Sequence, residues 1–166
     1  MDTMTLWDLL EKIFLNGKVL AVLAAAIAAI IPGIGSAKAV GSVGESLDGL
    51  LSEDPDKFGK GFLLQALPAT QGIYGLIIAF MIYMQITNVT EATFARGFYL
   101  IGAALPIAVC GYYSAVRQGR VACAGIATVA KRPEASGKCV IATAMVELYA
   151  LLALLISFLL VVLNPF

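Results

Sequence analysis

The sequence of 166 residues contains no histidine. Histidine is the usual general base near neutral pH and the commonest ligand of transition metals. Three cysteines are present, but Cys110, Cys123 and Cys139 are scattered without the close spacing of a metal or redox pair. We interpret them as small apolar helix residues. The sequence therefore disfavours histidine-based catalysis, a transition-metal site and a disulfide framework.

Charged residues are also scarce, at 13% of the chain, whereas 60% of the residues are hydrophobic. In an ordinary soluble domain about a quarter of the residues are charged. Together with a mean hydropathy of +0.91, this composition indicates an integral membrane protein. The formal net charge is zero, which argues against nucleic acid as a partner.

Four apolar stretches follow one another along the chain, and each is near the ~20 residues that a helix needs to span a bilayer. They are centred on residues 19–36, 62–86, 98–116 and 140–163. Short polar segments with a proline, "SEDPDK" (52–57) and "KRPEAS" (131–136), predict tight turns after the first and third helices. We expect those two helices to run to about residues 50 and 130. The predicted fold is an all-α membrane protein with four transmembrane helices.

The two halves of the chain align without gaps at an offset of 78 residues, which places Ser36 on Ser114 and Pro55 on Pro133. A unit of two spans restores the orientation of the chain, so the duplication is parallel. The sequence thus predicts two tandem helical hairpins, residues 1–88 and residues 89–166, and the second hairpin contains Glu147.

Basic residues favour one orientation in the membrane. Eight of them lie toward the two proline-containing turns: Lys38, Lys57, Lys60, Arg117, Arg120, Lys131, Arg132 and Lys138. Three lie toward the opposite side: Lys12, Lys18 and Arg96. The positive-inside rule places the turns in the cytoplasm and both termini outside.

Small residues recur at every fourth position of the first and third helices. They are Ala25, Ala29, Gly33, Ala37 and Gly41, and then Gly111, Ala115 and Gly119. Such faces let helix backbones approach closely. One interpretation is packing within a single bundle. The other is a tightly curved inner wall between identical copies, with the second and fourth helices facing outward.

Four polar residues are expected at one depth of the apolar region. Thr70 and Gln71 lie 15 and 16 positions after the first turn, Gln118 lies 15 before the second turn, and Glu147 lies 14 after it. At ~1.5 Å per residue, all four are about 22 Å from the turns. An acid within a membrane costs roughly 2.5–3.5 kcal/mol on insertion scales, so Glu147 is predicted to be functional.

The chemistry of these side chains favours a hard cation or a proton. A carboxylate, two amides and a hydroxyl are oxygen donors, which suit an alkali cation and suit soft metals poorly. Pro68 cannot donate to the carbonyl of Leu64 and disturbs the helix around Leu67, so main-chain carbonyls are additional oxygen ligands. An alternative role for either glutamine is a hydrogen bond between neighbouring helices. The position that matches Glu147 in the first half is Ala69, so one carboxylate serves four helices.

Four motifs in this order, "GIGSAKAVG" (33–41), "LPATQGIYG" (67–75), "RQGR" (117–120) and "MVELYALL" (145–152), resemble the membrane rotor proteolipids of V-type ATPases. The likeness covers essentially the whole chain and is greatest to the proteolipid of the bacterial sodium-translocating type. It implies a homo-oligomeric ring in the cell membrane, turned through a central stalk by an ATP-hydrolysing head and working against a stator subunit with an essential arginine. The chain itself would carry no ATP site.

The same resemblance implies which residues surround a transported Na⁺. They are Glu147, Thr70, Gln71, Gln118 and the Leu67 main-chain carbonyl, with Tyr74 bonded to the glutamate. Two alternatives remain open at this stage. The rotor could carry H⁺ instead of Na⁺, or the chain could be a stand-alone four-helix cation carrier.

Overall fold

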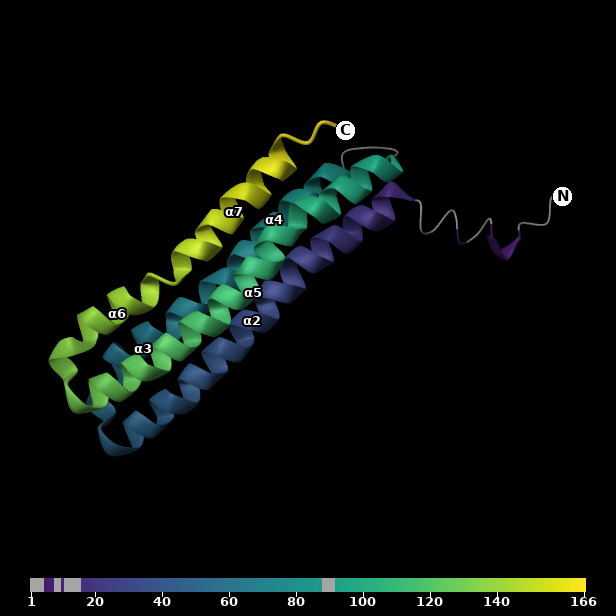
Figure 1. Ribbon diagram of the computed structural model, residues 1–166. Coiled ribbons are helices and arrows are strands. Elements are labelled where there is room, and N and C mark those ends of the chain that lie inside the picture. The colour runs from purple at the N-terminus through teal and green to yellow at the C-terminus, as the bar shows by residue number, and fades with distance from the viewer. Residues whose placement is uncertain (1–4, 8–9, 11–15, 88–91) are drawn as a thin grey trace.

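The computed structural model describes residues 5–7, 10, 16–87 and 92–166. In these ranges the chain consists of helices and turns without a β-strand, and the helices form one long antiparallel bundle (Figure 1). Two rods are continuous: α2 (Gly17–Glu53) and α5 (Phe94–Lys131). Two rods are interrupted, and the all-α fold is confirmed.

The first interrupted rod follows α2 and consists of η1 (Pro55–Lys57), α3 (Phe58–Ala66), η2 (Leu67–Ala69) and α4 (Thr70–Thr87). The second follows α5 and consists of η3 (Pro133–Ala135), α6 (Ser136–Ala144) and α7 (Glu147–Val162). The predicted boundary between the hairpins, at residues 88 and 89, lies outside the described residues. So does Lys12.

The two continuous helices begin and end through the same local chemistry. The side chains of Asn16 and Thr93 accept hydrogen bonds from amides of the first turn, at 2.9 and 3.3 Å, which satisfies donors that a helix start leaves unpaired. At the other end, Pro55 and Pro133 follow the last helical residues of α2 and α5 by two positions. The residue before a proline avoids helical backbone angles. The helices therefore end close to residues 50 and 130, as predicted.

Helices α2 and α5 pack closely together through small residues. Gly119 lies against Ala39, where a Cβ atom added to the glycine would be 2.8 Å from the Ala39 Cβ. Gly111 lies in the same way against Pro32. The small residues of α5 thus pack against α2 of the same chain, which agrees with the interpretation of packing within a single bundle. A Cβ atom at Gly41 of α2 would meet nothing within 4 Å, so this part of the small-residue face is open.

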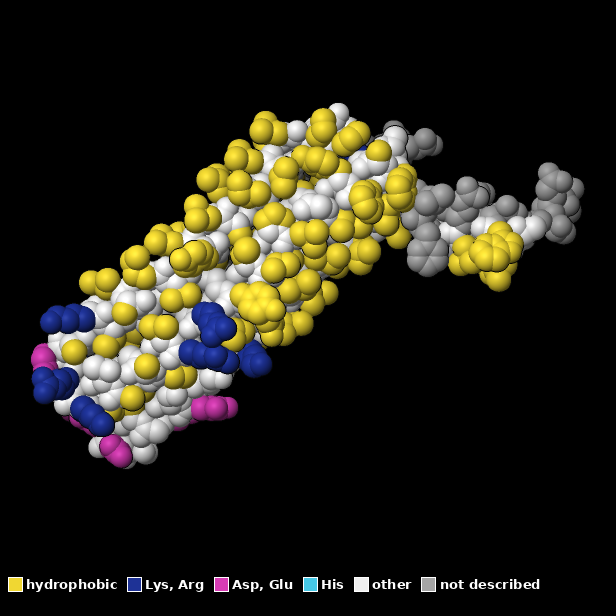
Figure 2. Space-filling view, viewed as in Figure 1, with side chains coloured by type: hydrophobic (Ala, Val, Ile, Leu, Met, Phe, Trp, Pro, Cys, Tyr) yellow, Lys and Arg dark blue, Asp and Glu magenta, His cyan; other side chains and the backbone are white. Residues whose placement is uncertain are grey.

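The outer surface is apolar over most of its length (Figure 2). Large side chains on α4 and α7 point outward, with both Phe80 and Leu152 61% exposed. Lys, Arg, Asp and Glu side chains gather toward the end of the molecule with the α2–α3 and α5–α6 turns. Within the described residues, four helical segments are long and apolar enough to cross a membrane: 17–53, 55–87, 94–131 and 133–162. The chain is an integral membrane protein.

Candidate cation-binding site

The interrupted rods are broken at equivalent positions of the two hairpins. The first break is η2, residues 67–69, and the second is the turn at residues 145–146 between α6 and α7. Positions 67 and 145 are 78 residues apart, which is the repeat offset. The sequence predicted the first break from Pro68. The second break has no proline and was not predicted.

At the first break, the Leu67 carbonyl oxygen is shared by two donors. The Thr70 amide bonds to it, because the helix tightens to a 3₁₀ turn here. The Thr70 hydroxyl also donates to it, at 2.9 Å. Pro68 is buried. The hydroxyl oxygen and the carbonyl oxygen therefore lie together at this break.

At the second break, side chains of α5 donate hydrogen bonds to main-chain carbonyls at the junction of α6 and α7. Gln118 Nε2 donates to the Thr143 carbonyl at 3.1 Å, and Ser114 Oγ donates to the Val146 carbonyl at 3.0 Å. The Val146 amide bonds to the Thr143 carbonyl at 3.2 Å, three residues back instead of four. Side chains from a neighbouring helix thus compensate for an irregular backbone in the membrane, as buried polar groups there require.

Gln71 and Gln118 form a buried amide pair between α4 and α5. Both side chains are 0% exposed. Gln71 Nε2 donates to Gln118 Oε1 at 2.7 Å and to Ser114 Oγ at 3.5 Å. This pairing is the interhelical role that the sequence left open for the glutamines.

The pairing occupies the amide nitrogen of Gln71 and leaves its amide oxygen without a hydrogen bond. Gln71 Oε1 is buried and has no hydrogen-bond partner in the structure. A buried amide oxygen without a donor costs free energy of about 1–3 kcal/mol. Such an unpaired oxygen is suited to bind a cation, because the ion can take the place of the missing hydrogen-bond donor.

The carboxylate of Glu147 lies at the start of α7 and is half-buried. Tyr74 donates its hydroxyl to Glu147 Oε1 at 2.5 Å. Tyr74 lies three residues after Gln71, so the two side chains share one face of α4. Gln71 is thus one helical turn from the tyrosine that bonds the carboxylate.

The six predicted residues therefore form three bonded pairs: Leu67 with Thr70, Gln71 with Gln118, and Tyr74 with Glu147. Among the described hydrogen bonds, none joins the carboxylate directly to the hydroxyl or to either amide. A ligand set of this kind would be completed by an ion between the pairs.

Sequence reasoning did not identify the residues that form hydrogen bonds at the two helix breaks next to these pairs. Ser114 and Thr143 are 6% and 0% exposed and bond the second break. Ser36, the repeat equivalent of Ser114, accepts a hydrogen bond from the Gly72 amide at 2.8 Å, just past the first break. The signal was available, because the repeat alignment already paired the two serines.

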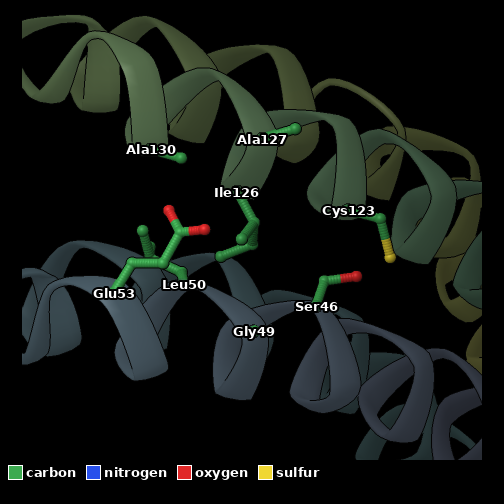
Figure 3. A pocket seen from close by; sticks show the side chains of 8 residues that line it. All are labelled: Ser46, Gly49, Leu50, Glu53, Cys123, Ile126, Ala127 and Ala130. Atoms are coloured by element: carbon green, nitrogen blue, oxygen red, sulfur yellow. The ribbon is translucent and has the colours of Figure 1, made fainter.

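A separate hollow of about 370 Å³ lies between α2 and α5, near the turns. Glu53 points toward it from α2, and Cys123 and Ile126 line it from α5 (Figure 3). Glu53 is the only carboxylate among the lining residues. This hollow therefore offers a cation far fewer oxygen ligands than the layer around Glu147.

Comparison with known proteins gives consistent results. The family model of the ATP synthase C subunit matches residues 23–82 and again residues 101–160. The matches begin 78 residues apart (101 minus 23), which confirms the duplication and its offset. The chain is 49% identical to the V-type sodium ATPase subunit K of Enterococcus hirae over 146 residues, which are 88% of this chain and 92% of that protein. It is 37% identical to the A-type ATP synthase subunit K of Methanocaldococcus jannaschii over 145 residues, 87% of this chain and 62% of that protein.

Proposed function

The chain belongs to the family of the ATP synthase C subunit, and we propose that it is the rotor-ring subunit of the membrane sector of a V-type ATPase, which carries Na⁺ across the membrane. Identical copies form the ring, and the ring turns as ATP is hydrolysed or synthesised elsewhere in the complex. A central-stalk subunit transmits the rotation. A stator subunit with an essential arginine receives each carboxylate after the ion has left it.

The observation that carries the proposal is the unpaired, fully buried oxygen of Gln71, one helical turn from the tyrosine that bonds Glu147. We assign the ion to the space served by Glu147, Gln71, Gln118, Thr70 and the Leu67 carbonyl. With one monovalent cation bound, the single carboxylate is neutralised. A neutral site can face lipid at much lower cost than an exposed charge.

Two arguments favour Na⁺ over H⁺. A protonated carboxyl donates a single hydrogen, so a proton engages at most one oxygen of this layer and leaves its other oxygen-bearing groups unexplained. A sodium ion that leaves water must replace its hydration oxygens, and the amide, hydroxyl and carbonyl oxygens of this layer can do so. The name of the Enterococcus hirae relative also specifies sodium.

For the location, we propose the cell membrane, with the α2–α3 and α5–α6 turns in the cytoplasm and both termini outside. The support is the charge distribution. Lys57, at the first turn, bonds Asp54 at 3.0 Å and the Ala130 carbonyl of α5 at 2.9 Å. The charged groups of this end thus belong to a polar surface that stays in water.

The test is labelling of Glu147 by a hydrophobic carbodiimide, which reacts with the protonated acid. Purified rings are labelled with and without millimolar sodium between about pH 5 and pH 9. Sodium should protect Glu147, and it should protect more strongly as pH rises, because fewer protons then compete for the carboxylate. Potassium at the same ionic strength serves as the control. If labelling depends on pH alone and sodium protects at no pH, the coupling ion is H⁺ and the sodium assignment is wrong.

A further inference from the structure

The fully buried Gln71 side chain can present either its oxygen or its nitrogen to an ion, and only the oxygen can bind a cation. Two groups accept from Gln71 Nε2 and orient the amide: Gln118 Oε1 at 2.7 Å and, in a longer contact, Ser114 Oγ at 3.5 Å. The question is what obliges those two groups to act as acceptors.

The answer lies in the second helix break. The Thr143 carbonyl can only accept, and Gln118 donates its nitrogen to it at 3.1 Å. The oxygen end of Gln118 is thereby turned toward Gln71. The Val146 carbonyl can likewise only accept, and Ser114 uses its single hydroxyl hydrogen on it at 3.0 Å. With its hydrogen used in this way, the Ser114 hydroxyl can only accept a further hydrogen bond.

Both acceptors therefore require the nitrogen of Gln71, and its oxygen is turned away from α5. We propose that Ser114 is a positioning residue: together with Gln118, it transmits the orientation of the α6–α7 carbonyls to the Gln71 amide and keeps Oε1 directed at the cation. This inference rests on the proposed function. Ser114 does not itself bind the ion.

The repeat supports a specific role for this serine. Its equivalent in the first hairpin, Ser36, accepts a main-chain bond from Gly72 and is described with no bond to a glutamine side chain. The first hairpin also has Ala69 where the second has Glu147. The serine that contacts the glutamine thus lies in the hairpin that holds the carboxylate, and it reaches across to Gln71 of the other hairpin.

The test compares Ser114→Ala with Ser157→Ala in assembled rings. Ser157 is a matched control, because it is also fully buried and also bonds across helices, accepting from the Ile107 amide at 3.1 Å. It lies ten residues beyond Glu147, about 15 Å along α7. The measured quantity is the sodium concentration that halves carbodiimide labelling of Glu147, with the pH profile of labelling without sodium as a second readout.

Ser114→Ala should raise the half-protecting sodium concentration about tenfold, the lower end of the effect of groups that orient metal ligands. Its pH profile without sodium should match wild type, because Ser114 makes no described contact with the carboxylate. Ser157→Ala should change neither quantity. If Ser114→Ala does not assemble, Ser114→Cys retains the size with weaker hydrogen bonding and should give a shift of several-fold.

Equal sodium protection in wild type and in the Ser114 variants would overturn the positioning role while leaving the sodium site intact. An equal shift in Ser157→Ala, or a changed pH profile in Ser114→Ala, would overturn it as well, because either shows general loosening of the helices. Absence of sodium protection in the wild type is a different result and would refute the proposed function instead.

Discussion

The contact between α2 and α5 can be tested with one pair of glycines. Gly119 of α5 lies against Ala39, and a Cβ atom at this position would be 2.8 Å from the Ala39 Cβ and 3.0 Å from the Ala39 Cα. Carbon atoms pack at about 3.5–4.0 Å, so Gly119→Ala forces the two helices apart by several tenths of an ångström or more. Gly41→Ala adds the same methyl group to α2, where no atom lies within 4 Å.

The pair isolates the energy of the contact. Both substitutions replace glycine by alanine inside a long helix, which is favourable by about 0.5–1 kcal/mol for the backbone. That gain cancels when the two variants are compared. Overpacking typically costs about 1–3 kcal/mol, so Gly119→Ala should be less stable than Gly41→Ala by about that amount.

The assay is an SDS titration of the purified chain, followed by circular dichroism, and the midpoint should be lower for Gly119→Ala. If the two midpoints agree within error, the inference that α2 and α5 approach closely at Gly119 is refuted.

Gly41 also allows a test on the assembled ring, because it lies on the open part of the small-residue face. Gly41→Leu should reduce or enlarge the rings seen by native mass spectrometry, and rings of normal mass would show that this face does not contact another copy.

Two further predictions concern the site. Glu147→Gln removes the only charge of the proposed ligand set, so sodium transport and coupled rotation should be abolished in reconstituted vesicles while rings still assemble; ion-coupled ATP hydrolysis in this variant would refute the assignment. Tyr74→Phe removes a hydrogen bond of 2.5 Å to the carboxylate. The half-protecting sodium concentration should rise at least about tenfold, because a hydrogen bond to a charged group contributes ~1.5–3 kcal/mol. An unchanged concentration in Tyr74→Phe would show that the hydroxyl does not help to hold the carboxylate for the ion.

Much of the architecture could be predicted because it depends on local or periodic features. Span length, the prolines after α2 and α5, and the repeat offset of 78 residues are all visible in the sequence. The polar layer was also predictable, since helical rise converts positions along two hairpins into depth. The use of the small residues was not. Gly119 and Gly41 occupy similar places in the pattern, and only the rotation of each helix decides which one is covered inside the chain.

The second helix break shows why local sequence was insufficient at the site. Pro68 announces the first break, because proline cannot donate to the helix ladder. At the equivalent position the second hairpin has Val146, whose amide can donate as in an ordinary helix. Its break is accompanied instead by hydrogen bonds from Ser114 and Gln118, more than two dozen residues earlier in the chain.

The two breaks thus differ in what they leave for chemistry. Where proline removes a donor, the neighbouring Thr70 hydroxyl bonds the Leu67 carbonyl of its own turn. Where proline is absent, the carbonyls of Thr143 and Val146 accept hydrogen bonds from Gln118 and Ser114 of α5, and the oxygen end of Gln118 is left to accept from Gln71. A proline at Val146 would retain its carbonyl but could not form the amide bond to Thr143. In the proposed site, the two breaks of the duplicated backbone would therefore differ in role: the first would supply oxygen ligands, and the second would orient them.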